Sequence, residues 1–125
     1  MAKKRRKTPE EDLQRTVADY LNLIAPMHGF WWSHIAHGGR RTKAEAGIFK
    51  AMGLKPGIAD IMIVAGCTIA ASGPRVYWIE IKAPGRDQSP AQIAFQQAME
   101  ARGCAYRVCW SFEEVKATLE DWGLE

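Results

Sequence analysis

Apolar positions follow a helical period near the start of the chain. The apolar stripe consists of Leu13, Val17, Tyr20, Leu21 and Ile24. This spacing is typical of a helix that buries one face against a core. Thr8 and Pro9 supply an N-cap and a proline at the first helical position, and Glu11 is spaced as a capping-box glutamate. The pattern predicts a helix that begins after Thr8 and ends at Pro26.

The rest of the chain alternates between β-rich runs and capped helical segments. Aromatic and β-branched residues predict strands at 30–36, 58–65, 75–83 and 105–110. Capping residues predict helices that begin at Thr42, Ser89 and Ser111. The runs 58–65 and 75–83 are expected to form a hairpin. The element order is α-β-α-β-β-α-β-α, which indicates a single α/β domain.

The charge is distributed unevenly along the 125 residues, whose formal net charge is +3. Five of the 17 basic residues lie in one run, and they are Lys3, Lys4, Arg5, Arg6 and Lys7. The remaining 12 basic residues are outnumbered by the 14 acidic ones. We therefore predict a basic, mobile arm at 1–7 that holds a polyanion, and a folded domain at 8–125.

Several classes of protein are excluded by the composition. The most apolar window, 58–71, contains Asp60 and is too short to cross a membrane, and no secretory signal follows the basic run. The three cysteines are expected to be reduced, and Cys104 and Cys109 to pack in the core. The sequence contains neither a P-loop nor a dinucleotide-binding fingerprint, so no nucleotide cofactor is expected. These features predict a soluble, cytoplasmic protein without a membrane partner.

Two predicted strands carry charges where apolar residues are expected. Asp60 interrupts the run 58–64, and Glu80 and Lys82 interrupt the run 76–82. Asp60 and Glu80 are symmetric about Ala70, so a symmetric hairpin brings the two carboxylates face to face. A bound hard cation such as Mg²⁺ removes this conflict, and Lys82, on the same face, can hold a water beside it. The alternative is a solvated face or a simple ion pair.

A third acidic candidate lies in the first helix. Glu10 falls on the apolar stripe and is expected to face inward, whereas Glu11 is explained by the capping box. Together with G-I-A-D (57–60), I-E-I-K (79–82) and S-P-A-Q (89–92), this glutamate completes a pattern that resembles the VRR-NUC family of the PD-(D/E)xK nuclease superfamily. The resemblance extends from Thr8 to Gly123. Two positions depart from it: Ala59 replaces the usual proline, and His37 a common asparagine.

The resemblance implies a restriction-endonuclease-like fold, with a mixed central sheet flanked by helices, and a role for each site residue. Asp60 and Glu80 ligate Mg²⁺ or Mn²⁺, Glu10 completes the acidic set directly or through water, and Lys82 assists the nucleophile. The backbone carbonyl of Ile81 is a further candidate ligand. Gln92 lies beside the site, although it is equally well explained as a capping-box residue.

The remaining basic positions, together with the histidines and tryptophans, are the other candidates for nucleic-acid contact. Arg40, Arg41 and Lys43 lie beside paired glycines at a helix start, which suits phosphate contact but equally suits a solvated loop. His34 and His37 fall on opposite faces of a strand and are poor joint zinc ligands. The five tryptophans are expected in the core or an interface rather than as base-stacking platforms.

The sequence thus predicts a metal-dependent DNA endonuclease. The resemblance further implies a homodimer that is selective for branched DNA, such as four-way junctions or flaps, in a bacterial or phage-infected cell. Two alternatives stay open, a non-catalytic DNA-binding module and an RNA-processing nuclease with the same core, because the sequence does not separate DNA from RNA.

Overall fold

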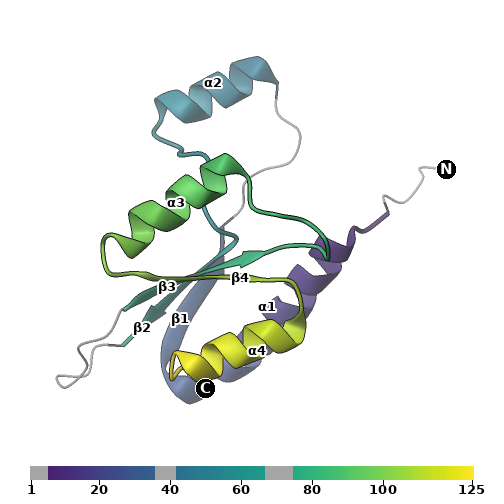
Figure 1. Ribbon diagram of the computed structural model, residues 1–125, viewed down its shortest axis with the longest axis vertical. Coiled ribbons are helices and arrows are strands. Elements are labelled where there is room, and N and C mark those ends of the chain that lie inside the picture. Colours follow the sequence, from purple (N-terminus) through teal and green to yellow (C-terminus); the bar gives the residue numbers. More distant parts are fainter. Residues whose placement is uncertain (1–5, 36–41, 67–74) are drawn as a thin grey trace.

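The predicted order of helices and strands is confirmed by the computed structural model, which describes residues 6–35, 42–66 and 75–125 (Figure 1). The elements are α1 (Pro9–His28), β1 (Phe30–His34), α2 (Lys43–Ala51), β2 (Ile61–Ala65), β3 (Val76–Ile81), α3 (Pro90–Glu100), β4 (Ala105–Cys109) and α4 (Phe112–Asp121). Lys3, Lys4, Arg5, His37, Arg40 and Arg41 lie outside the described residues, and so does Cys67.

The four strands form one mixed sheet in the order β1-β2-β3-β4. β1 and β2, and β2 and β3, pair antiparallel, whereas β3 and β4 pair parallel. Ile61 lies opposite Ile79 and Met62 opposite Trp78, which is the register that symmetry about position 70 predicts. β2 begins at Ile61, however, so the expectation that Asp60 lies within the strand is wrong.

Helices cover both faces of this sheet. α1 and α4 share one hydrophobic core with the sheet, in which Leu21, Ile63, Ile79 and Leu119 are fully buried. α3 covers the opposite face, where Phe95 meets the Trp78 ring edge-on at a centroid distance of 5.0 Å. Figure 1 shows α3 on one side of the strands and α1 with α4 on the other. The sheet is therefore the middle layer of three.

The first helix begins as predicted but continues beyond Pro26. Thr8 caps it by accepting the N–H of Glu11, and the helix ends at His28, where Gly29 in the left-handed conformation donates its N–H to the Ala25 carbonyl. Proline removes one helical hydrogen bond, whose acceptor would be four residues earlier. That acceptor is the carbonyl of Asn22, and Asn22 and Pro26 are both exposed, so water can satisfy it.

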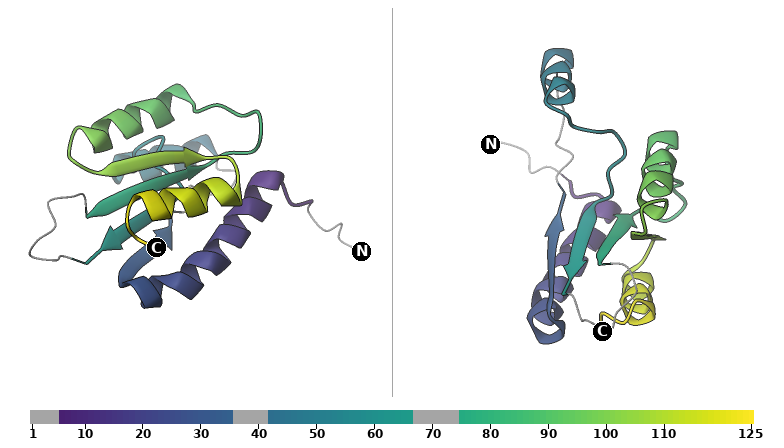
Figure 2. Two further views of the ribbon diagram at one scale, coloured as in Figure 1. Left: turned by 60° about the horizontal axis from the view of Figure 1, so that its bottom comes forward. Right: turned by 90° about the vertical axis from the view of Figure 1, so that its left-hand side faces the viewer.

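α2 differs from the other three helices because all nine of its residues are exposed. Figure 2 shows it standing apart from the sheet and from α3. Ile48 in this helix and Met52 at its C-cap are 59% and 76% exposed. No helix in the described ranges is long and apolar enough to cross a membrane.

The two described cysteines and three of the tryptophans occupy the core positions expected of them. Cys109 is fully buried, and Cys104 packs under α3. Trp78 is buried, and Trp32 and Trp122 pack against the larger core. Trp31 and Trp110 differ, because they are 57% and 36% exposed.

One glycine fixes the distance between the segment before β2 and the start of α3. Gly57 has a φ of +77°, and a Cβ at this position would lie 2.2 Å from the Ala91 carbonyl oxygen and 2.8 Å from the Gln92 nitrogen. Only glycine lets the two backbones approach this closely. Gly57 therefore determines where the first turn of α3 sits relative to Asp60.

We expect Gly57→Ala to lower the free energy of unfolding by about 2–4 kcal/mol, because it adds left-handed strain and a clash with backbone. Gly103→Ala is the matched control, since Gly103 also has a positive φ (+83°) but nothing within 4 Å of an added Cβ. The control should lose only about 1 kcal/mol in urea unfolding. Equal losses in the two variants would contradict the close approach.

Candidate metal centre

Asp60 lies where β2 diverges from β3, and its position is determined by hydrogen bonds at both ends. Its carboxylate Oδ2 accepts the backbone N–H of Ile81 at 2.7 Å, a donor that a continued strand would otherwise have paired. Its carbonyl accepts the Ile35 N–H at 2.7 Å and the His34 Nδ1–H at 2.9 Å. Since a carbonyl can only accept, His34 carries its hydrogen on Nδ1. These contacts join Asp60 to β1 and β3.

Glu80 is a carboxylate inside β3 with 2% of its surface exposed. Its Oε1 accepts the side-chain N–H of Gln92 at 3.2 Å, whereas Oε2 is shielded from solvent and has no partner among the described residues. A buried carboxylate oxygen without a hydrogen bond is costly, unless a proton or a cation sits on it. Glu80 is therefore built to take up a positive charge.

Three carboxylates converge at this point. One oxygen each of Glu10, Asp60 and Glu80 lies within 4.8 Å of the others. Burial, the charge of Asp60 and a hydrogen bond that a protonated Glu80 makes to Asp60 raise the pKa of Glu80 to about 9, against the opposing charge of Lys82. Burial and Asp60 also raise the pKa of Glu10, and the cations Lys82 and Arg86 oppose this rise. Oxygen donors of this number suit a hard divalent cation.

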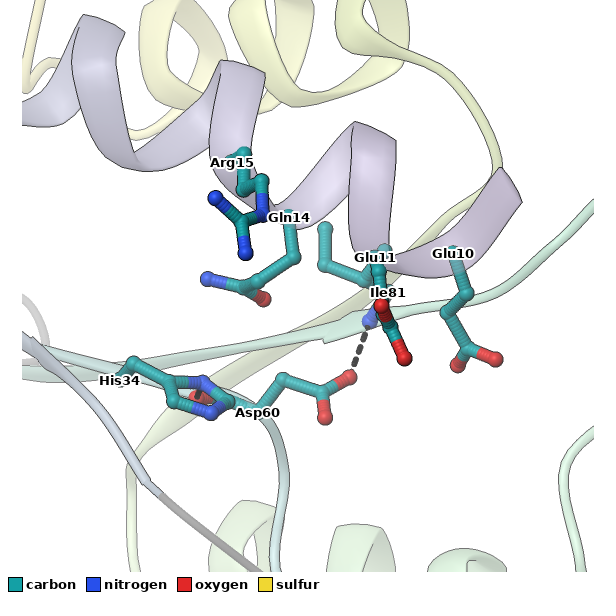
Figure 3. A pocket seen from close by; sticks show the side chains of 7 residues that line it. All are labelled: Glu10, Glu11, Gln14, Arg15, His34, Asp60 and Ile81. Atoms are coloured by element: carbon teal, nitrogen blue, oxygen red, sulfur yellow. Dashed lines mark hydrogen bonds between the residues drawn. The ribbon is translucent and has the colours of Figure 1, made fainter. Parts of the chain in front are cut away.

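Two cavities open on either side of the acidic cluster, and both are lined by Glu10 and Asp60. The first, of about 380 Å³, lies under α1 and adds Gln14, Arg15 and His34, whose side chains Figure 3 shows around Asp60. The second, of about 370 Å³, lies toward the start of α3 and is further lined by Lys55, Gly57, Glu80 and Gln92. The cluster thus borders both cavities.

The structure brings together most of the residues that the sequence singled out. Glu10, Asp60 and Glu80 are adjacent, and the charge of Lys82 acts on Glu80. Gln92 makes both expected contacts, because its Oε1 accepts the Ser89 N–H at 2.8 Å while its Nε2 donates to Glu80. Lys43 lies in the exposed α2. Arg6 and Lys7 are exposed at the start of the chain.

Sequence reasoning missed two groups of residues around the cluster. Gln14 and Arg15 line the first cavity, and both amide atoms of Gln14 are shielded without a hydrogen-bond partner in the described chain. The signal was present, because Gln14 follows Glu10 by one helical turn and so shares its face. Arg86, whose charge reaches Glu10, lies in a loop where no periodicity applies.

The fold and the acidic cluster define an α/β domain with a candidate metal site at a hairpin edge, and two solved structures share this fold. One, described as a "VRR_NUC domain protein", is 21% identical with a TM-score of 0.70 and covers 94% of this chain and 90% of its own. The other, described as a "VRR_NUC domain", is 16% identical with a TM-score of 0.59 and covers 91% and 97%. This chain has the VRR-NUC fold, as the sequence predicts. Neither the protein-family models nor the curated proteins gave a match.

The raised pKa of Glu80 predicts a specific pH dependence of stability. Since the folded pKa of about 9 exceeds the ordinary value of 4.5, the folded state holds an extra proton between these values, and stability falls as pH rises through this window. Glu80→Gln removes this titration and keeps an acceptor for Gln92. In EDTA, we expect the Tm of Glu80→Gln relative to the parent to rise by roughly 5–10 °C from pH 5 to pH 8.

The control for this experiment is Glu120→Gln, which neutralises an exposed glutamate of α4. Its Tm relative to the parent should change little between the two pH values. A constant difference for Glu80→Gln would show that Glu80 is ionised throughout and would contradict the raised pKa.

Proposed function

We propose that this protein is a divalent-metal-dependent nuclease that hydrolyses the phosphodiester bonds of DNA. The observation that carries the proposal is a buried carboxylate oxygen of Glu80 that has no hydrogen-bond partner among the described residues. The Glu80 side chain converges with Glu10 and Asp60, and the charge of Lys82 acts on it. A cluster of this composition suits a metal ion that binds phosphate. The names of the two structural neighbours agree with this class of activity.

Asp60 and Glu80 would hold the metal, with Glu10 as the third acid and the Ile81 carbonyl as a further candidate. Mg²⁺ or Mn²⁺, when bound there, acts as a Lewis acid that lowers the pKa of water and offsets the charge of the phosphate. The hydrogen bond from Ile81 N–H orients the Asp60 carboxylate, and the Gln92 amide orients that of Glu80. Neither acid can rotate away without losing a partly buried hydrogen bond.

Lys82 has a different role, because its ammonium can only donate hydrogen bonds. It follows Glu80 by two residues in the extended chain and therefore projects to the same face. At that place it would orient the attacking water and stabilise its negative charge as the proton leaves. The second cavity, which extends from Glu80 to Lys55, leaves room for the phosphate backbone.

We expect Mg²⁺ or Mn²⁺ to support cleavage of labelled DNA and EDTA to abolish it. Asp60→Asn and Lys82→Met should each lower kcat by at least about 100-fold, because one removes a ligand charge and the other a group that assists the nucleophile. The substrates are single strand, duplex, flap and four-way junction DNA, with an RNA duplex in parallel. Gel electrophoresis of the products gives the rates.

The matched controls are Asp121→Asn and Lys116→Met, which change the same residue types on α4. Both should cleave like the parent. Cleavage that survives EDTA, or equal rates in Asp60→Asn and the parent, would contradict the proposal. Tight binding without cleavage would favour a non-catalytic module, and cleavage of RNA alone an RNA-processing nuclease.

The proposal extends to a homodimer that acts on branched DNA. A helix of nine residues is marginal on its own, and α2 has no buried residue to stabilise it. Ile48 and Met52 lie four residues apart and so present one apolar face to solvent. A second copy that covers this face would stabilise α2 and pair two active sites, as cleavage of both strands of a junction requires.

We expect light scattering after size exclusion to give twice the chain mass for the parent, and a lower mass for Ile48→Asp combined with Met52→Asp. A charge buried in a dimer interface without a partner opposes association. Leu23→Asp is the control, since Leu23 is also exposed, at 65%, but lies on α1. A parent that elutes as a monomer at all concentrations would contradict the dimer.

A further inference from the structure

A tight turn follows β3, between Lys82 and the start of α3. The Arg86 N–H donates to the Ala83 carbonyl at 3.1 Å, with Pro84 and Gly85 at the two central positions. Gly85 has a φ of +79°, as the third residue of a type II turn requires, and proline fixes φ at the second. Both central residues thus favour a single conformation. Arg86 therefore leaves the turn in a defined position, four residues after Lys82.

The carbonyl of Arg86 accepts a hydrogen bond from a side chain that follows the neighbouring strand β4. Trp110 directly follows β4, and its indole Nε1–H donates to the Arg86 carbonyl at 2.8 Å. The backbone of Trp110 is itself fixed, because its N–H donates to the Glu114 carboxylate at the start of α4. β3 and β4 run parallel, with Ile81 opposite Cys109, so Trp110 emerges beside the turn. The turn is thus fixed at its start by the chain that leaves β3 and at its end by the hydrogen bond from Trp110.

The side chain of Arg86 is exposed and carries a charge that no described carboxylate pairs within 4.0 Å. It lies close enough to the acidic cluster to act on Glu10, whose pKa is raised mainly by burial and by Asp60 and is opposed by Lys82 and Arg86. A guanidinium in this position offers up to five N–H donors in a fixed plane, which suits a phosphate group.

We propose that Arg86 binds a backbone phosphate next to the scissile one, and that Trp110 is a positioning residue that acts by holding the Arg86 turn. This inference rests on the proposed nuclease function and adds a site outside the acidic cluster. The ligand is a phosphodiester of the nucleic-acid backbone, so the contact adds affinity without reading sequence. In this proposal, the exposed indole of Trp110 holds the Arg86 turn in place and does not stack on a base.

The test compares Arg86→Gln, Arg86→Lys, Trp110→Phe and the double variant Arg86→Gln/Trp110→Phe in the full chain. Binding of a fluorescent four-way junction is measured with Ca²⁺ over a series of KCl concentrations, and KM and kcat are measured with Mg²⁺. Trp110→Phe keeps an aromatic ring but removes the N–H donor. Thermal unfolding of each variant verifies that the fold is retained.

We expect Arg86→Gln to raise KM by roughly tenfold, to leave kcat within about twofold, and to reduce the slope of log K against log salt by about 1. Arg86→Lys should keep the slope of the parent. Trp110→Phe should raise KM by about threefold, and should add nothing further in the Arg86→Gln background, because its effect passes through Arg86.

The matched controls are Arg102→Gln, in the turn after α3, and Trp31→Phe, on the edge strand β1. Both should behave as the parent. The inference is overturned if Arg86→Gln keeps the parent's KM and salt slope, or if Trp110→Phe has the same effect in both backgrounds. If the parent cleaves with Mg²⁺ and Arg86→Gln has the same KM and salt slope, this inference is rejected and the proposed function stands. A parent that neither binds nor cleaves nucleic acid rejects the proposed function as well.

Discussion

The desolvation of two neighbouring carboxylates is the constraint on which the rest of the structure depends. Glu80 is 2% exposed and lies beside Asp60, so the pair is unfavourable whenever both are ionised without a counter-charge. One oxygen of each carboxylate accepts a hydrogen bond, from Ile81 N–H at Asp60 and from the Gln92 amide at Glu80, which orients the two side chains. The ionised pair lowers the free energy of unfolding, and a cation bound between the two carboxylates would raise it again. Under the proposed function, a divalent cation would supply the missing counter-charge, and its attraction to the carboxylates would be stronger here than at a fully solvated site.

Much of this arrangement could be read from the sequence because it depends on local rules. The register pairs Ile61 with Ile79 and so brings Asp60 near Glu80. It follows from two apolar strands of matched length, because a slip by one residue would turn the isoleucines toward the wrong face. The helix starts at Thr8, Thr42, Ser89 and Ser111 follow from capping chemistry, which involves residues only three positions apart.

The parts that the sequence did not predict depend on tertiary context. The sequence predicts that Pro26 ends the helix, but Pro26 lies on the exposed side of the last turn and the chain is capped instead at Gly29. Asp60 leaves the ladder because its own carboxylate replaces a strand partner for Ile81, and no local pattern encodes that exchange. Arg86 and Trp110 meet across 24 residues of chain, through a backbone carbonyl, which carries no residue-specific signal.

Gln92 shows why a capping residue and a site residue can be the same one. A capping box is made equally well by glutamate or glutamine at the third helical position, since either can accept the N–H of the cap. Only glutamine has a second polar atom that donates, and here its Nε2 reaches Glu80 while its Oε1 accepts from Ser89. A glutamate would place another carboxylate beside a cluster that already holds three. Gly57 lets the first turn of α3 approach the segment before β2, so the side chain at position 92 lies beside the cluster. An amide is therefore required there. Through its two hydrogen bonds, Gln92 connects the cap of α3 to the carboxylate of Glu80.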